Sequence, residues 1–140
     1  MPGEAETVTA EKRFQKARDY DTQIEMMIEK SAEVRASLTR CVSNYDYGKI
    51  TGSNDPHRLD QIAVIQDNLD RLLVESASYK KYLLDWIYSE PELSRGERCV
   101  LISYYINGLS LEAAAERTAY SRKQAFNLRK SALEKLDQFS

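Results

Sequence analysis

Apolar and small residues recur at alternating spacings of three and four along the first two thirds of the chain. This pattern predicts two long amphipathic helices. The first is expected from Thr9, a suitable N-cap, to about Cys41. The second is expected from Asp55 and Pro56 to about Tyr88, because proline at the first helical position loses no hydrogen bond. Two apolar columns form the seam of each helix: Ala17, Ile24, Ser31, Leu38 with Tyr20, Met27, Val34, Cys41, and Ile62, Leu69, Ser76, Leu83 with Ile65, Leu72, Tyr79, Trp86.

The stretch between these helices, residues 43–55, contains two of the five glycines and no helical period, so it predicts a connecting loop. Two matching seams joined by a loop indicate an antiparallel helical hairpin. The alignment that we expect places Leu38 near Ile65, Val34 near Leu69, and Met27 near Ser76.

Further apolar residues widen the surface of the expected hairpin beyond the seams: Met26, Ile28, Val64, Leu73 and Leu84. Such a surface should seek more helices, and we therefore expect a homodimer. The alternative is that the C-terminal part of the same chain covers it. Lys80 and Lys81 fall off the seam and are expected on a solvated face.

The last third of the chain predicts three shorter helices with marked start and stop signals. Pro91 ends the second long helix, because the residue before proline disfavours helical geometry. Capping boxes at Ser94 with Glu97 and at Ser121 with Gln124 open the first and third of these helices. The remaining signals are Asn107-Gly108, which closes the first helix, and Ser110, which caps a helix from Leu111 to about Thr118. The turn before the last helix, Thr118 to Tyr120, has the length typical of a helix-turn-helix.

The last helix, expected to end near Gln138, carries two chemically different faces. Its apolar face consists of Ala125, Leu128, Ala132, Leu133 and Leu136. The opposite face carries Arg122, Lys123, Asn127 and Lys130, with Phe126 between them. From Ser94 onward the formal charge is +3, whereas the whole chain has −2. An acidic protein can still bind DNA through one basic helix, so this face is a candidate for base and phosphate contacts.

Composition narrows the class of protein. Five glycines and three prolines in 140 residues favour an all-α protein. No apolar run approaches the roughly 20 residues needed to cross a bilayer, and the acidic N-terminus is unlike an export signal, so we expect a cytoplasmic protein. Cys41 and Cys99 lack metal-ligand spacing and are expected to be small buried hydrophobes, and His57 is expected to be a polar helix-start residue. We expect no metal, no cofactor and no enzymatic activity.

Four segments of the C-terminal third are similar to parts of one known family: Leu93–Leu101 (LSRGERCVL), Gly108–Glu112 (GLSLE), Ser121–Ala125 (SRKQA) and Ala132–Leu136 (ALEKL). Together they resemble region 4 of sigma-70-type factors. The whole layout, a long helical N-terminal part followed by this block, resembles the phage-encoded late-transcription regulators of the ArpU and RinA type, which occur in prophages of Gram-positive bacteria. The resemblance implies a DNA-binding regulator that acts at promoters.

The resemblance also implies roles for single residues. Arg122, Lys123 and Asn127 fall where that family reads bases in the major groove, and Gln124 belongs to the same turn. Arg117, Ser121, Arg129 and Lys130 would contact phosphates. Phe126 replaces a usual polar residue and can contact a thymine methyl group or pack on protein. Ala119 replaces the usual glycine of the turn, where a left-handed residue costs an alanine roughly 1 kcal/mol.

We therefore expect an all-α protein with a helical hairpin over residues 1–90 and a helix-turn-helix domain over residues 91–140 that binds double-stranded DNA sequence-specifically. The alternative is an interaction protein that binds RNA polymerase or another regulator and has little affinity for DNA. Salt dependence separates the two, because each phosphate contact adds about one unit of slope to the plot of log affinity against log salt.

Overall fold

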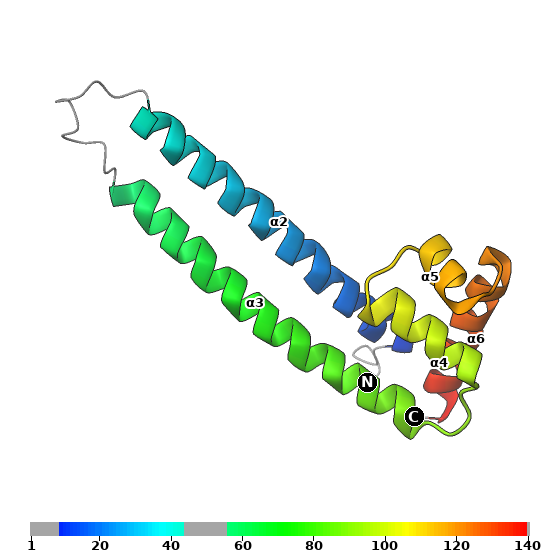
Figure 1. Cartoon of the computed structure of the whole chain (residues 1–140). Helices are drawn as coiled ribbons and strands as arrows, with labels where there is room; N and C mark the ends of the chain where they lie inside the picture. The colour runs from blue at the N-terminus through cyan, green and yellow to red at the C-terminus, as the bar shows by residue number, and fades with distance from the viewer. Residues whose placement is uncertain (1–8, 44–55, 140) are drawn as a thin grey trace. The chain divides into compact units, whose positions relative to one another are not determined.

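The computed structural model describes the backbone of residues 9–43 and 56–139, and the side chains of residues 9–40 and 59–139. All regular structure in these ranges is helical, which confirms the all-α prediction (Figure 1). The elements are α2 (Ala10–Ser43), α3 (Pro56–Ser89), α4 (Arg95–Leu101), the π-helical segment η1 (Ile102–Ile106), α5 (Leu111–Thr118) and α6 (Arg122–Phe139). Among the helices described, none combines the length and the apolar character that a bilayer span requires.

The ends of the long helices agree with their start and stop signals. The Thr9 hydroxyl accepts a hydrogen bond from the Lys12 N–H at 3.3 Å, as expected of an N-cap. Helix α3 begins at Pro56 and ends at Ser89, directly before Glu90 and Pro91. Residues 44–55 of the expected loop, which include the predicted helix-start residue Asp55, lie outside the described residues. The side chains of Cys41 and His57 lie outside them too.

The chain divides into two compact units, which differ from the division at residue 90 that the sequence suggested. Unit 1 comprises residues 1–21 and 76–140, and unit 2 comprises residues 22–75. The start of α2 and the end of α3 belong to unit 1 because both contribute side chains to its core. The packing of unit 1 therefore includes parts of both long helices.

One cluster of buried side chains forms the main core of unit 1: Ala10, Phe14, Ala17, Leu83, Ile87, Leu93, Leu101, Tyr105, Ala132, Leu133 and Leu136. The Phe14 ring lies at its centre, with centroid distances of 5.5 Å to Trp86 and 5.3 Å to Tyr105. Phe14 and Ile87 lie outside the predicted seams. They point to the C-terminal helices, so the C-terminal part of the chain covers these ends of α2 and α3.

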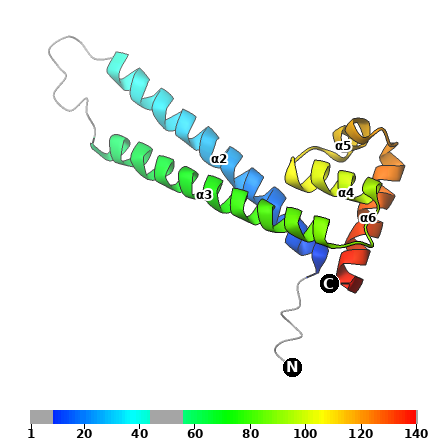
Figure 2. The same ribbon diagram turned by 60° about the horizontal axis from the view of Figure 1, so that its bottom comes forward.

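Helices α4, α5 and α6 lie together in both views of the molecule (Figure 2). A second buried cluster, Val100, Ala115 and Ala125, joins them and is flanked by Leu111, Tyr120 and Leu128. Alanines at the contact let helices approach closely, because a methyl group is the only side chain between the backbones. The predicted apolar face of the last helix is confirmed, with Leu128 half-buried and its other members buried.

The junction between α4 and α5 contains an element that the sequence did not predict. The expected helix does end at Asn107, and Gly108 adopts a φ of +69°, but its last turn is the π-helical segment η1. Arg18 of α2 donates hydrogen bonds from Nη1 to the carbonyl oxygens of Tyr104 at 2.7 Å and Leu109 at 2.8 Å. This guanidinium therefore satisfies one carbonyl group within the irregular segment and one that follows it.

Lys80 does not lie on a solvated face, although its position off the seam predicted one. Its Nζ lies 2.6 Å from a carboxylate oxygen of Asp21, and both side chains are partly buried. Lys81 behaves as expected, since its only ion pair in the described chain is an exposed one with Asp85 at 3.7 Å.

Unit 2 contains residues 22–43 of α2 and 56–75 of α3, which run antiparallel (Figure 1). Its described seam residues are all buried or half-buried, as predicted: Ile24, Met27, Ser31, Val34, Leu38, Ile62, Ile65, Leu69 and Leu72. The residues expected to widen the apolar surface are exposed in this unit: Met26, Ile28, Val64 and Leu73. Only Val34 and Ile65 are buried among the described apolar side chains of unit 2.

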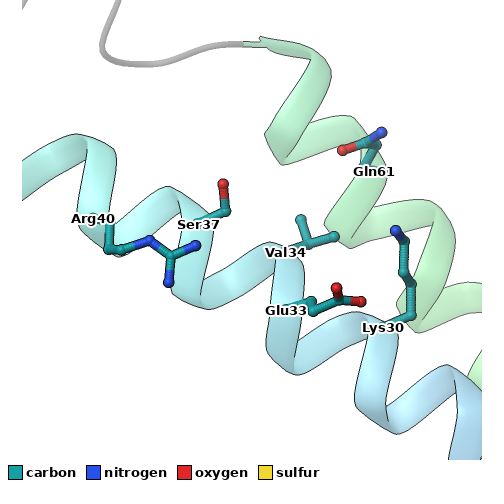
Figure 3. Close-up of a pocket in the computed structure, with 6 residues that line it drawn as sticks. All are labelled: Lys30, Glu33, Val34, Ser37, Arg40 and Gln61. Atoms are coloured by element: carbon teal, nitrogen blue, oxygen red, sulfur yellow. The ribbon is translucent and has the colours of Figure 1, made fainter.

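The alignment of the two helices in unit 2 differs from the expected one. Val34 and Gln61 line a common pocket of about 330 Å³ together with Lys30, Glu33, Ser37 and Arg40 (Figure 3). Gln61, which lies beside Val34 in this pocket, precedes the expected neighbour Leu69 by eight positions. This displacement is not a whole heptad, and Gln61 belongs to neither apolar column, so the seven-residue repeat does not explain the observed alignment.

Candidate nucleic-acid interface

Helix α6 starts at a capping box whose two hydrogen bonds fix its first turn. The Ser121 hydroxyl accepts from the Gln124 N–H at 3.1 Å, and the Gln124 side-chain oxygen accepts from the Ser121 N–H at 2.9 Å. Both predicted DNA-binding side chains therefore already bind backbone groups. The cap defines where the helix begins and hence which residues its first turn presents.

The amino-terminal half of α6 presents a row of polar and basic side chains: Arg122, Lys123, Gln124, Asn127 and Lys130 are all exposed. Ala125, between them in sequence, is fully buried on the opposite face. The helix is thus held through its apolar face while its donors remain accessible. Arg122 makes one exposed ion pair, to Glu112 at 3.8 Å, which contributes little in high dielectric.

The connection from α5 to α6 is short and well defined. Ala119 adopts φ 63° and ψ 29°, and it is the only described non-glycine residue with positive φ. The Tyr120 N–H donates to the Ala115 carbonyl at 2.9 Å, a pattern that closes helices at a left-handed residue. The left-handed conformation that the sequence analysis considered for Ala119 is present.

The Glu97 carboxylate connects α4 to Ser131 and Lys135 of α6. It accepts hydrogen bonds from the Ser94 N–H at 2.8 Å, the Ser131 hydroxyl at 2.7 Å and the Lys135 ammonium at 2.8 Å. Burial alone raises the pKa of Glu97, but these hydrogen bonds to the charged form outweigh burial and lower the pKa below its ordinary value. An ionised Glu97 therefore holds α6 against α4.

Arg129 differs from the other predicted contact residues, because its side chain is half-buried and engaged within the protein. Its guanidinium carbon lies 4.9 Å from the Tyr104 ring centroid and 5.4 Å from that of Phe126. Arg18 lies over the same Tyr104 ring at 4.0 Å. Buried Arg129 Nε has no hydrogen-bond partner in the described chain. The environment of Arg129 thus favours a role in packing over a phosphate contact.

Phe126 lies at the edge of the candidate interface and is 43% exposed. It lines a pocket of about 310 Å³ with Thr9, Glu11, Arg129, Lys130, Leu133, Glu134 and Asp137. The start of α2 therefore lies beside the aromatic residue of the exposed face. A partner that binds this face would contact an apolar ring as well as cations.

Arg117 is exposed at the end of α5 and lines a pocket of about 540 Å³ with Arg95, Gly96, Cys99, Ile102, Ser103, Thr118 and Tyr120. The Cys99 thiol is free and half-buried, whereas the sequence analysis expected it to be buried. Among the described residues no group of three or more His, Cys, Asp or Glu side chains is arranged to hold a metal ion.

Comparisons of the chain with protein-family models, curated proteins and solved structures gave no significant match. The residues themselves therefore carry the functional argument. The sequence predicted the exposed row on α6 and the capping box at its start. It missed Tyr104 and Arg18, whose importance follows from an irregular segment without a sequence signal.

Proposed function

We propose that this protein is a sequence-specific, phage-derived regulator of transcription that binds double-stranded DNA at promoters. In this proposal α5 and α6 form a helix-turn-helix, and the amino-terminal turns of α6 enter the major groove. The observation that carries the proposal is the division of α6 into a buried apolar face and an exposed row of donors.

We assign base contacts to Arg122, Lys123 and Asn127, which follow one another along the exposed face. Arginine can pair bidentately with guanine, and asparagine can pair with adenine. Exposed Lys130 and Arg117 are assigned to phosphates, which position the protein without reading sequence. Because the Arg129 guanidinium lies on Tyr104, we assign it to the support of α6.

The proposal gives the long helices a role in assembly. We propose that α2 and α3 form a hairpin and that a second copy of the chain packs on the half-buried seam of unit 2. A two-fold dimer would bind a site made of two related half-sites. The exposed apolar side chains of Met26, Ile28, Val64 and Leu73 support this arrangement, because a partner would cover them.

The test measures the binding of variants to duplex DNA. Selection from random duplexes with the full chain supplies a preferred site, and a scrambled duplex serves for comparison. We expect Arg122→Ala to cost about 1–3 kcal/mol on the preferred site and far less on the scrambled one. Lys130→Ala should weaken both duplexes alike. Equal losses from Arg122→Ala on both duplexes would contradict base reading, and Lys81→Ala provides the control at an exposed lysine elsewhere.

The second candidate function is an interaction protein that binds RNA polymerase or another regulator through the same block. Phe126 favours it, because a half-exposed aromatic ring beside a pocket is typical of protein contacts. Titrations at several salt concentrations separate the candidates. A steep fall of DNA affinity with salt supports the phosphate contacts, whereas weak and salt-independent binding supports the protein partner.

A further inference from the structure

Aromatic and cationic side chains gather on unit 1 where the first turns of α2 face the last turns of α3. The set consists of Arg13, Lys16, Tyr79, Tyr82 and Trp86, which we call the aromatic surface. The three rings form a continuous row, with centroid distances of 5.6 Å from Tyr79 to Tyr82 and 6.2 Å from Tyr82 to Trp86. None of these residues belongs to the candidate DNA interface on α6.

The two cations of the aromatic surface are held in place by the rings. The Arg13 guanidinium lies 5.5 Å from the Trp86 ring centroid, and its Nη1 donates to the Tyr82 hydroxyl at 3.3 Å. The Tyr79 hydroxyl donates to the Arg13 carbonyl at 2.7 Å. Lys16 Nζ lies 4.8 Å from the Tyr79 centroid. These contacts favour positions of the two cations beside the rings, and both side chains remain exposed to a partner.

Neither Arg13 nor Lys16 has an ion pair with a carboxylate in the part of the chain that the structure describes. Asp85, which makes an exposed ion pair with Lys81 at 3.7 Å, is the acidic residue among those that line the pocket of this surface. The aromatic surface therefore presents two positive charges that form no ion pair with a described acidic group, against the one carboxylate of Asp85. A complementary partner has to supply negative charge.

A pocket of about 420 Å³ accompanies the charges and is lined by Arg13, Tyr82, Asp85, Trp86 and Ser89. Tyr82 is 44% exposed, although its ring contributes to the row. Tryptophan, tyrosine and arginine are the residues most enriched among those that dominate binding energy at protein interfaces. The composition and the pocket together indicate a surface that can accept a large side chain of a partner.

Three other kinds of occupant fit these contacts less well. A nucleic acid base would need a free ring face, but Phe14 stacks on Trp86 at 5.5 Å and Tyr82 lies nearly parallel to Trp86. A cationic ligand would meet Lys16 and Arg13, which already occupy the rings. A second copy docked symmetrically through this surface would bring the same cations together, which is unfavourable.

We propose that the aromatic surface binds an acidic segment of a partner protein. Carboxylates of the segment pair with Arg13 and Lys16, and an adjacent large apolar side chain enters the pocket beside Tyr82 and Trp86. This interaction is independent of DNA binding through α6 and does not rest on it. It gives the start of α2 and the end of α3 a function besides the packing of the core.

Peptide selection with the full chain tests the proposal. A random 12-residue peptide library is panned against the protein, and the enriched peptides are titrated while the fluorescence of Trp86 is recorded. Trp86 is the single tryptophan of the chain, so its emission reports on the aromatic surface directly. We expect enriched peptides with several Asp or Glu residues around one aromatic or aliphatic residue.

Variants then locate the binding site. Tyr82→Ala and Lys16→Glu should each weaken the selected peptides about tenfold or more. Tyr88→Ala serves as the matched control, because Tyr88 is 65% exposed on the same helix and has no described ring contact. Replacing the acidic residues of the peptide by lysine should restore binding to Lys16→Glu. Circular dichroism verifies that each variant is folded.

Several outcomes would overturn the proposal. Enriched peptides without acidic residues would contradict the charge complementarity. Affinities that are unchanged in both Tyr82→Ala and Lys16→Glu would place the binding elsewhere. Tighter binding of a single-stranded oligonucleotide than of any selected peptide, with the same sensitivity to Tyr82→Ala, would assign the surface to nucleic acid. Failure of duplex binding through α6 would leave these measurements unaffected.

Discussion

The two units of the molecule use the same helices but bury their apolar residues to very different extents. In unit 1, Phe14, Leu83 and Ile87 are fully buried, because η1 and α6 supply further side chains to the core. In unit 2 only Val34 and Ile65 are buried among the described apolar side chains, and both retain slight exposure. A stripe of apolar residues on two helices forms a closed core only when additional elements cover it.

This difference shows what a helical seam determines and what it leaves open. It determines which side of a helix faces the neighbouring helix, and the half-buried residues of unit 2 agree with that. It does not determine how completely the seam is covered, because two helices alone leave each stripe accessible along its edges. Stability should therefore concentrate in unit 1, and unit 2 is the part that a second copy of the chain would stabilise.

The largest expected effect compares the same substitution at two positions of α3. Leu83→Ala in unit 1 removes a fully buried side chain and should cost about 2–5 kcal/mol of unfolding free energy. Leu72→Ala in unit 2 removes a half-buried side chain and should cost less than about 1.5 kcal/mol, because less apolar area returns to water. Urea unfolding followed by circular dichroism measures both values.

Protein concentration sharpens this comparison. If a second copy covers the seam of unit 2, the stability of the wild type rises with concentration, and Leu72→Ala reduces that dependence. If the chain is a monomer, the free energy of unfolding that each variant loses does not change with protein concentration. Equal costs for Leu83→Ala and Leu72→Ala in a monomer would contradict the difference in burial between the units.

The next effect concerns the Glu97 carboxylate, which is ionised and buried in unit 1. Glu97→Gln removes the charge that accepts hydrogen bonds from Lys135 and Ser131, and it should cost about 1–3 kcal/mol at neutral pH. Because the pKa of Glu97 is lowered in the folded state, its contribution is present above the ordinary carboxyl pKa of about 4.3. It is lost as the pH falls through the lower folded value.

Urea unfolding at a series of pH values measures this contribution. The wild type should lose more stability than Glu97→Gln on acidification below about pH 4.3. Glu134→Gln is the matched control on the exposed side of α6 and should retain the pH dependence of the wild type. Identical pH profiles for the wild type and Glu97→Gln would rule out a stabilising role for the ionised group.

The smallest expected effect is a gain of stability at the turn before α6. A left-handed alanine costs roughly 1–2 kcal/mol, which Ala119→Gly relieves. The greater conformational entropy of glycine in the unfolded chain offsets about 0.4–1 kcal/mol of this stabilisation. Thermal unfolding should therefore show a net stabilisation of about 0.5–1 kcal/mol.

The control for this prediction is the same substitution at a helical position. Ala113→Gly, within α5, should destabilise by about 1 kcal/mol because glycine is a poor helix former. A loss of stability in Ala119→Gly as well would show that the left-handed conformation is not strained in solution. The positive φ of Ala119 would then carry no measurable cost in stability.

Local signals in the sequence predicted much of the fold. The hydroxyls of Ser94, Ser110 and Ser121 cap the three helices that they were expected to open. The apolar columns also identified the buried and half-buried residues of unit 2. These features depend on residues within one or two turns, so the pattern contains the information that they need.

Features that depend on distant residues could not be predicted in the same way. The position of Gln61 beside Val34, where Leu69 was expected, has no signal in the seven-residue repeat. The half-buried state of Arg129 depends on Tyr104, which the irregular segment η1 carries. The row of donors on α6 was predicted from its period, but the assignment of Arg129 required the tertiary contacts.

One hydrogen bond spans almost the whole chain and affects how the protein can fold during synthesis. The Ala10 N–H donates to Asp137 at 2.6 Å, across 127 positions in sequence. A ribosome releases α2 before α6, so the first turn of α2 can form this hydrogen bond only after Asp137 has been synthesised. Contacts of such separation slow folding, and truncation before Asp137 would remove the partner of the Ala10 N–H in the first turn of α2.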